Sequence, residues 1–178
     1  RRLRKAPQAD SEPFDLVVLQ VGRGGLNQQE RFPVLESLEH NYAPLLREHN
    51  PSCRVLLYQT WSDPHDVPGE EARRAEGVEE LYAKLREAGL ETDIAWTGEA
   101  WRRLSEGSAS VGCDVDRGIY PALFKDDSGH PSALAGLLNA AVLLLTLAGV
   151  VGAPPTRPLG LIMEKILPQT WRTASSGY

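Results

Sequence analysis

The chain has 178 residues, which is enough for about one domain with a sizeable buried core. Hydrophobic residues make up 42% of the chain and charged residues 24%, as in ordinary globular proteins. The formal net charge of −5 argues against a general nucleic-acid binder, because such proteins present a basic surface.

The first 13 residues form a polar segment that opens with several basic side chains. We interpret residues 1–13 as a solvated tail and linker, with contact to a partner or an anionic surface as the alternative. From the absence of an initiating Met and of a signal-peptide pattern, we expect a chain that is processed or cut at its N-terminus. The sequence does not assign a cellular compartment. We expect a soluble or peripheral protein, and its N-terminus is compatible with import into an organelle. Two distant cysteines, Cys53 and Cys113, suit free thiols in a reducing compartment.

Short apolar runs predict three strands. Phe14–Val21 is nearly continuous, rich in Val and ended by glycines, which is typical of a strand buried on both faces of a parallel sheet. Arg54–Trp61 has the same pattern, and Thr92–Trp96 is a third, shorter strand.

Helical spacing of apolar residues separates these strands. The first long helix is predicted to stop at Asn50 before a proline, and the second at Gly89. The last long helix begins with a proline in its first turn, where proline is tolerated. The predicted helices span residues 30–49, 69–88, 98–104, 131–148 and, as a short candidate, 158–167.

The alternation of strands and helices predicts an α/β domain over residues 14–149, with a parallel sheet and right-handed crossovers. Residues 150–178 then form a Pro-rich C-terminal extension. In such sheets active groups collect at the carboxyl ends of the strands. The polar loops at those ends are 20–27, 60–66, the turn at Gly98, and 127–130.

The apolar segment 133–151 is just long enough to span a bilayer. It is rich in Ala and Gly, and no charged anchors follow it, so we favour a buried core helix. A helix that faces a membrane or a partner is the alternative.

The sequence Asp127-Ser128-Gly129-His130 places a carboxylate three residues before a histidine. Such a pair can form the acid–base half of a Ser-His-Asp hydrolase: the carboxylate fixes the imidazole tautomer, and the imidazole takes a proton from the serine. Asp126 is a rival carboxylate. The structural alternative is that Asp127 and His130 only cap the helix predicted to start at Pro131.

Other candidate sites are weaker. The glycine-rich stretch 22–25 lacks the Lys-Ser/Thr of a phosphate loop. His65 lies at a predicted strand end and is either a surface residue or part of the cleft. No His, Cys and Asp set has metal-ligand spacing, so we expect neither a metal nor a cofactor.

Four motifs occur in an order that resembles the SGNH/GDSL hydrolase superfamily, and more closely an SGNH-like branch with a similar central strand. They are Phe14–Gln20, Val55–Trp61, Gly98–Trp101 and Asp127–Ser132. The resemblance covers residues 14–149. It implies a three-layer α/β/α domain with a flavodoxin-like parallel sheet, incomplete on its N-terminal side.

The resemblance implies that His130 is the general base and Asp127 its orienting carboxylate. The family's oxyanion block reads Gly-x-Asn; here Gln20, Asn27 and the backbone N–H of Gly22 are the candidates. The family's Gly-Asp-Ser nucleophile block has no counterpart in this chain, because none of its serines follows a buried strand through a glycine turn.

Two functions follow from this pattern. The first, which the missing nucleophile favours, is an SGNH-like domain without catalysis that serves as an accessory or structural subunit of a larger assembly. Other protein chains would then cover the apolar sheet edge and dock the extension at 150–178. The alternative is the C-terminal part of an active serine esterase whose nucleophile lies in a missing upstream segment.

Overall fold

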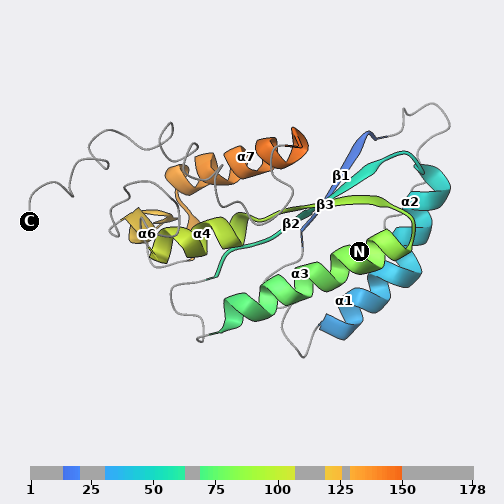
Figure 1. Cartoon of the computed structure of the whole chain (residues 1–178), viewed down its shortest axis with the longest axis horizontal. Helices are drawn as coiled ribbons and strands as arrows, with labels where there is room; N and C mark the ends of the chain where they lie inside the picture. The colour runs from blue at the N-terminus through green and yellow to red at the C-terminus, as the bar shows by residue number, and fades with distance from the viewer. Residues whose placement is uncertain (1–13, 21–30, 63–68, 107–118, 126–128, 150–178) are drawn as a thin grey trace, which may run out of the picture.

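The structure is a computed structural model that describes residues 14–20, 31–62, 69–106, 119–125 and 129–149. Its centre is a parallel sheet of three strands in the order β1 (Leu16–Gln20), β2 (Arg54–Tyr58) and β3 (Glu91–Ala95) (Figure 1). Helices flank this sheet. The predicted α/β architecture and parallel sheet are therefore confirmed, although each strand starts or ends a few residues away from its predicted bounds.

One helical stretch connects β1 to β2. It consists of α1 (Arg31–Ser37), η2 (Leu38–Tyr42) and α2 (Ala43–His49), where the sequence predicts a single helix. In the π-helical turn η2, the N–H of Ala43 donates to the carbonyl of Leu38. Pro44 explains the wide turn, because proline has no N–H to donate and its ring would clash with the carbonyl four residues earlier.

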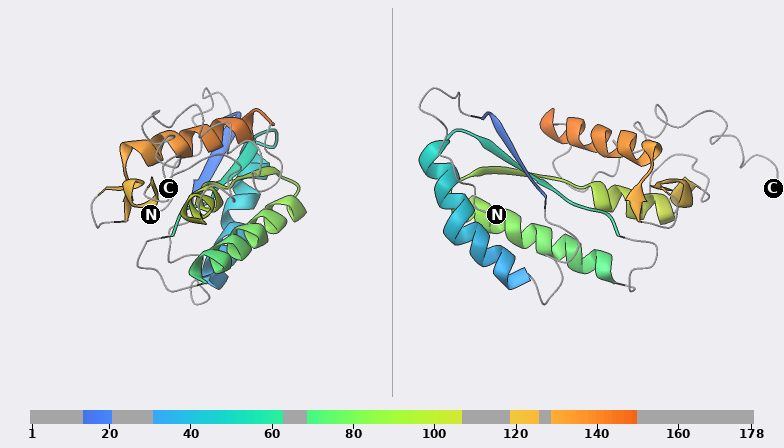
Figure 2. Two further views of the ribbon diagram at one scale, coloured as in Figure 1. Left: turned by 60° about the vertical axis from the view of Figure 1, so that its left-hand side comes forward. Right: turned by 180° about the vertical axis from the view of Figure 1, so that it is seen from behind.

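The helix α3 (Glu70–Glu87) connects β2 to β3 and lies on the same side of the sheet as α1 (Figures 1 and 2). It ends just before Gly89, which has a φ of 80° and permits the left-handed turn that stops the helix, as predicted. Its buried face packs against the sheet at helical spacing. The core on this side contains Leu38, Val55, Leu57, Val78, Leu81, Leu85 and Leu90.

The helices α4 (Thr97–Glu106) and α7 (Ala133–Leu147) build the second core, with α7 across the opposite face of the sheet (Figure 2). Three short elements join them: α6 (Ile119–Ala122), β4 (Phe124–Lys125) and β5 (His130–Pro131). They are too short to show periodicity in the sequence. This core contains Leu56, Ala100, Trp101, Leu104, Ile119, Leu123, Leu138 and Val142.

The strand β1 is at one edge of the sheet, and no described strand pairs with its outer side. The carbonyl of Asp15 accepts the N–H of Arg54, so the backbone groups of alternate residues, Leu16, Val18 and Gln20, point away from β2. Val18 is 51% exposed and Phe14, just before the strand, 69%. An uncharged apolar strand is unusual at an open edge.

The helix α7 is a core helix on one side only. Leu138, Asn139 and Val142 are buried, whereas Leu137 and Leu144 are exposed on the outer side. The expectation of a core helix is thus met by one face of the helix. No helix among the described residues combines the length and the apolar character needed to cross a membrane.

Leu81→Ala should lower the free energy of unfolding by about 2–5 kcal/mol, because Leu81 is fully buried and its loss leaves a cavity between α3 and the sheet. The same change at Leu144, which is 67% exposed, should cost less than about 0.5 kcal/mol. Urea unfolding of both variants measures the difference, and equal losses would contradict this assignment of the core.

Candidate functional site

Gln59 joins the carboxyl ends of β2 and β3. Its backbone N–H donates to the carbonyl of Ala95 at 3.1 Å, and its own carbonyl accepts the hydroxyl of Thr97. Its side-chain oxygen accepts the backbone N–H of Glu99 at 2.9 Å. Glu99 is in the first turn of α4, where backbone N–H groups have no partner inside the helix. Gln59 therefore supplies the capping acceptor that a Ser or Asp at the start of the helix would otherwise provide.

Gly98 is required by the close approach of these two strand ends. A Cβ atom at this position would lie 2.4 Å from the carbonyl oxygen of Thr60 and 3.1 Å from the side chain of Gln59. The first contact is with backbone, which cannot swing away. The glycine of the Gly98–Trp101 motif is thus explained by packing.

Trp61 connects the end of β2 to the segment that carries His130. Its ring stacks on Trp101, with the ring centroids 4.6 Å apart and an interplanar angle of 11°. Its indole N–H donates to the carbonyl of Gly129 at 3.1 Å. Trp101 is fixed in turn, because its own N–H donates to the side chain of Asn139 on α7 at 2.8 Å. The residue before His130 is therefore held at the carboxyl end of the sheet.

His130 is exposed in β5, opposite Lys125 of β4. The helix that follows begins at Ala133, two residues later than predicted, because Pro131 pairs in β5 and Ser132 is the N-cap. The hydroxyl of Ser132 accepts the N–H of Ala135 at 3.4 Å and donates to the carbonyl of Ala122 at 2.7 Å. The prediction that Pro131 lies in the first turn of the helix is therefore wrong, and Ser132 is the N-cap residue.

The other predicted site residues are only partly described. Gln20, an oxyanion candidate, is exposed at the carboxyl end of β1. Five more candidates lie outside the described residues, so the pairing of Asp127 with His130 stays a prediction. These are Gly22, Asn27, His65, Asp126 and Asp127.

Three of the described serines have structural hydrogen bonds. Ser132 caps α7, Ser105 donates to the carbonyl of Arg102 at 2.6 Å, and Ser62 accepts a guanidinium N–H of Arg74 at 3.2 Å. Ser132 lies two residues after His130 in the sequence, and its hydroxyl already donates to a backbone carbonyl. Because the hydroxyl protons of Ser132 and Ser105 are donated to backbone carbonyls, these contacts argue against a nucleophilic role for these two serines.

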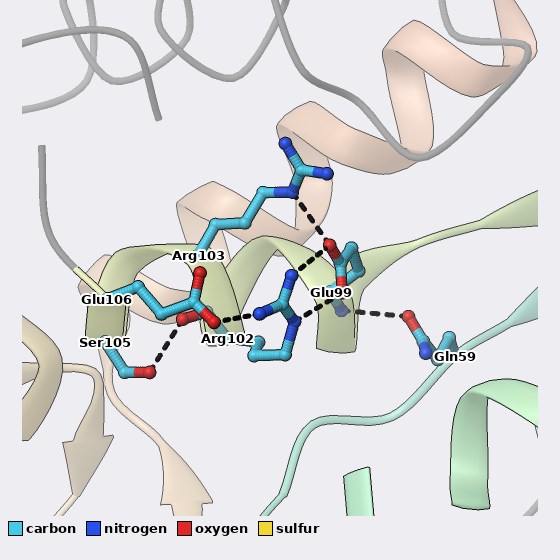
Figure 3. A network of polar contacts seen from close by, with 6 residues as sticks. All are labelled: Gln59, Glu99, Arg102, Arg103, Ser105 and Glu106. Carbon is cyan, nitrogen blue, oxygen red and sulfur yellow. Dashed lines mark hydrogen bonds and ion pairs between the residues drawn. The ribbon is translucent and has the colours of Figure 1, made fainter. Parts of the chain in front are cut away.

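Charged side chains gather where α3 meets α4. Glu99 accepts hydrogen bonds from Arg102 at 2.7 Å and from Arg103 at 2.8 Å, and Arg102 also contacts Glu106 (Figure 3). Burial alone would raise the pKa of Glu99, but the bonds from the two arginines outweigh it and hold the pKa below its ordinary value.

Glu71 of α3 faces the same group of charges and behaves in the opposite way. Desolvation by burial raises the pKa of its carboxyl group to about 7, while the arginines Arg102 and Arg74 act against the rise and the carboxylates Glu99 and Glu106 add to it. At neutral pH this carboxyl group is therefore partly protonated, so the charge between α3 and α4 varies with pH.

Sequence patterns did not point to Gln59 or Arg74 as parts of this site. Arg74 is 3% exposed, and a buried arginine in an otherwise charged amphipathic helix has no distinctive spacing. No group of three or more His, Cys, Asp and Glu side chains that could hold a metal ion occurs among the residues described by the structure.

Comparison of the chain with models of protein families, with curated proteins and with solved structures found no match.

Gly98→Ala should lower the free energy of unfolding by roughly 1–3 kcal/mol, because its Cβ would force the first turn of α4 away from the backbone of Thr60, just after β2. Gly136→Ala in α7 is the matched control: no atom lies within 4 Å of its added Cβ, so it should be neutral or stabilise by up to about 1 kcal/mol. Chemical denaturation compares the two. A neutral Gly98→Ala would show that the strand ends can move.

Glu71→Gln should change how stability depends on pH. The folded state holds the Glu71 proton up to about pH 7, whereas the unfolded state releases it near the ordinary value of 4.5. The contribution of Glu71 to stability is therefore complete below about pH 4.5 and is lost as the pH rises through about 7. The stability of Glu71→Gln relative to wild type should rise between pH 5 and pH 8, as measured by urea unfolding. Glu79→Gln, at an exposed position on the same helix, is the matched control, and an equal trend in both variants would contradict the assignment to Glu71.

Proposed function

We propose that this chain is the histidine-bearing part of an SGNH-like acyl hydrolase, in which a further strand along β1 supplies the nucleophilic serine. The observation that carries the proposal is the 3.1 Å hydrogen bond from the indole of Trp61 to the carbonyl of Gly129. It holds the exposed His130 at the end of the sheet where active groups of α/β proteins collect.

The capping arrangement of α7 supports a chemical role for His130. Ser132 is the N-cap, so neither His130 nor Asp127 is needed at that position. An exposed imidazole on a segment fixed by Trp61, Ser132 and the pairing with β4 is suited to proton transfer.

The outer side of β1, with which no described strand pairs, supports the proposed position of the nucleophile. A strand added parallel to β1 would bring its carboxyl end to the same edge of the sheet as Gln20 and the end of β2. A serine just after that strand would then lie at the carboxyl edge of the sheet, where Trp61 holds the segment that carries His130.

In the proposed reaction, the serine oxygen attacks the carbonyl carbon of an ester while His130 takes the hydroxyl proton. Asp127 would orient the imidazole. Gln20, Asn27 or the backbone N–H of Gly22 would stabilise the oxyanion. His130 then returns the proton to the leaving alcohol, and a water activated in the same way releases the acid and restores the serine.

A second function is an accessory domain without catalysis, in which the added strand belongs to a partner and brings no serine. The exposure of Val18 and Phe14 favours it, because an apolar edge fits a permanent structural contact irrespective of chemistry. Both functions share the added strand and differ only in the presence of the nucleophile.

A fluorophosphonate probe should label the native protein on a serine outside these 178 residues. His130→Ala should slow the labelling roughly 100-fold or more, the usual contribution of a general base. His49→Ala, an exposed histidine on α2, is the matched control and should label at the wild-type rate.

Labelling that is equally fast in His130→Ala would exclude His130 as the base. A native protein that takes no label, while a known serine esterase in the same sample does, would favour the accessory domain. Hydrogen exchange then tests the shared strand: the amides of Leu16, Val18 and Gln20 should exchange at least tenfold more slowly in the native assembly than in the 178-residue chain. Equal exchange would exclude a strand at this edge.

A further inference from the structure

Arg74 is a buried cation close to the predicted site. Its guanidinium Nη1 donates to the carbonyl of Trp61 at 3.0 Å and to the hydroxyl of Ser62 at 3.2 Å, and its Nε is 3.8 Å from a carboxylate oxygen of Glu70. The side chain is only 4% exposed. A buried charge is costly unless it is paired and hydrogen-bonded, so these contacts hold the guanidinium in one place.

The two residues bonded by Nη1 of Arg74, Trp61 and Ser62, lie in the segment that follows β2 at the carboxyl end of the sheet. Arg74 comes from the next helix, α3. The contact therefore fixes the backbone of Trp61 from the α3 side, while Trp101 fixes its ring from the other side. With backbone and ring both held, the direction of the indole N–H is defined.

That N–H donates to Gly129, the residue before His130. Gly129 has a φ of 67°, a left-handed conformation in which the chain turns sharply into β5. A shift of the Trp61 backbone would move the carbonyl of Gly129 and, with it, the direction of the His130 side chain.

We propose that Arg74 is a positioning residue that sets the orientation of His130 through Trp61 and Gly129. The inference rests on the proposed function, since His130 acts there as the base. Arg74 itself touches neither a substrate nor the reacting atoms. Misplacement of a catalytic group by about 1 Å can cost on the order of 100-fold in rate, which is why a distant support of this kind matters.

The test uses nuclear magnetic resonance of the folded protein, with the Trp61 indole N–H and the His130 ring as probes. Arg74→Met retains much of the side-chain volume and removes every hydrogen-bond donor of the guanidinium. The resonances of the Trp61 indole N–H and of the His130 ring should therefore both shift. Arg74→Lys retains the charge and one donor towards Trp61, and the probes should return towards their wild-type positions. Arg73→Met is the matched control, since Arg73 bonds Glu70 on the same helix and is more exposed.

In the native protein, fluorophosphonate labelling should fall at least tenfold in Arg74→Met, recover in part in Arg74→Lys, and stay at the wild-type rate in Arg73→Met. A folded Arg74→Met with unchanged Trp61 and His130 resonances would overturn the proposal. If Arg74→Met does not fold, Trp61→Phe is the second test, because it retains an aromatic ring to stack on Trp101 and removes the indole N–H. An unchanged His130 resonance in Trp61→Phe would overturn the proposal that His130 is oriented through Trp61.

The resonances report the position of His130 whether or not the protein hydrolyses an ester. A native protein that takes no label, but in which Arg74→Met moves His130, would contradict the hydrolase and leave the positioning intact. Labelling that depends on His130 but not on Arg74 would support the hydrolase and contradict the positioning role of Arg74.

Discussion

The set of bonds made by Gln59 is the constraint on which the rest of the site depends. A single residue at the end of β2 fixes the end of β3 through its backbone and caps α4 through its side chain. The contact is possible only because Gly98 has no side chain. From this junction the chain after β2 leads to Trp61, and α4 leads to Trp101, so the two indole rings meet as a consequence of how the strand ends are joined.

Much of the fold could be predicted from hydrophobic patterning, because β2 and α3 each bury a continuous or periodic set of apolar residues. The π-helical turn at Leu38–Tyr42 could not, since the apolar spacing there still fits an ordinary helix and the deviation comes from one proline. The start of α7 was misplaced for a related reason. Proline suits a first helical turn, but Pro131 here pairs with Phe124.

The candidate site likewise contains one residue that a sequence motif indicates and others that only tertiary contacts reveal. The motif indicates His130 as a candidate, and the contact of Trp61 with Gly129 shows that the segment before it lies at the carboxyl end of the sheet. Gln59 and Arg74 could not be assigned their roles, because hydrogen bonds over 40 and 13 residues depend on tertiary packing and leave no local signal. Long-range polar contacts of this kind are what sequence periodicity misses.

The uncharged edge of β1 also bears on how this domain is made. Natural proteins usually protect an open strand with a charge, a proline or a bulge, and Leu16–Gln20 has none of these. Two copies of such a strand can pair with each other, so a newly synthesised domain in which this edge is uncovered can associate with a second copy of itself. The additional strand proposed above would prevent that association when it is synthesised before β1 or close to it in time.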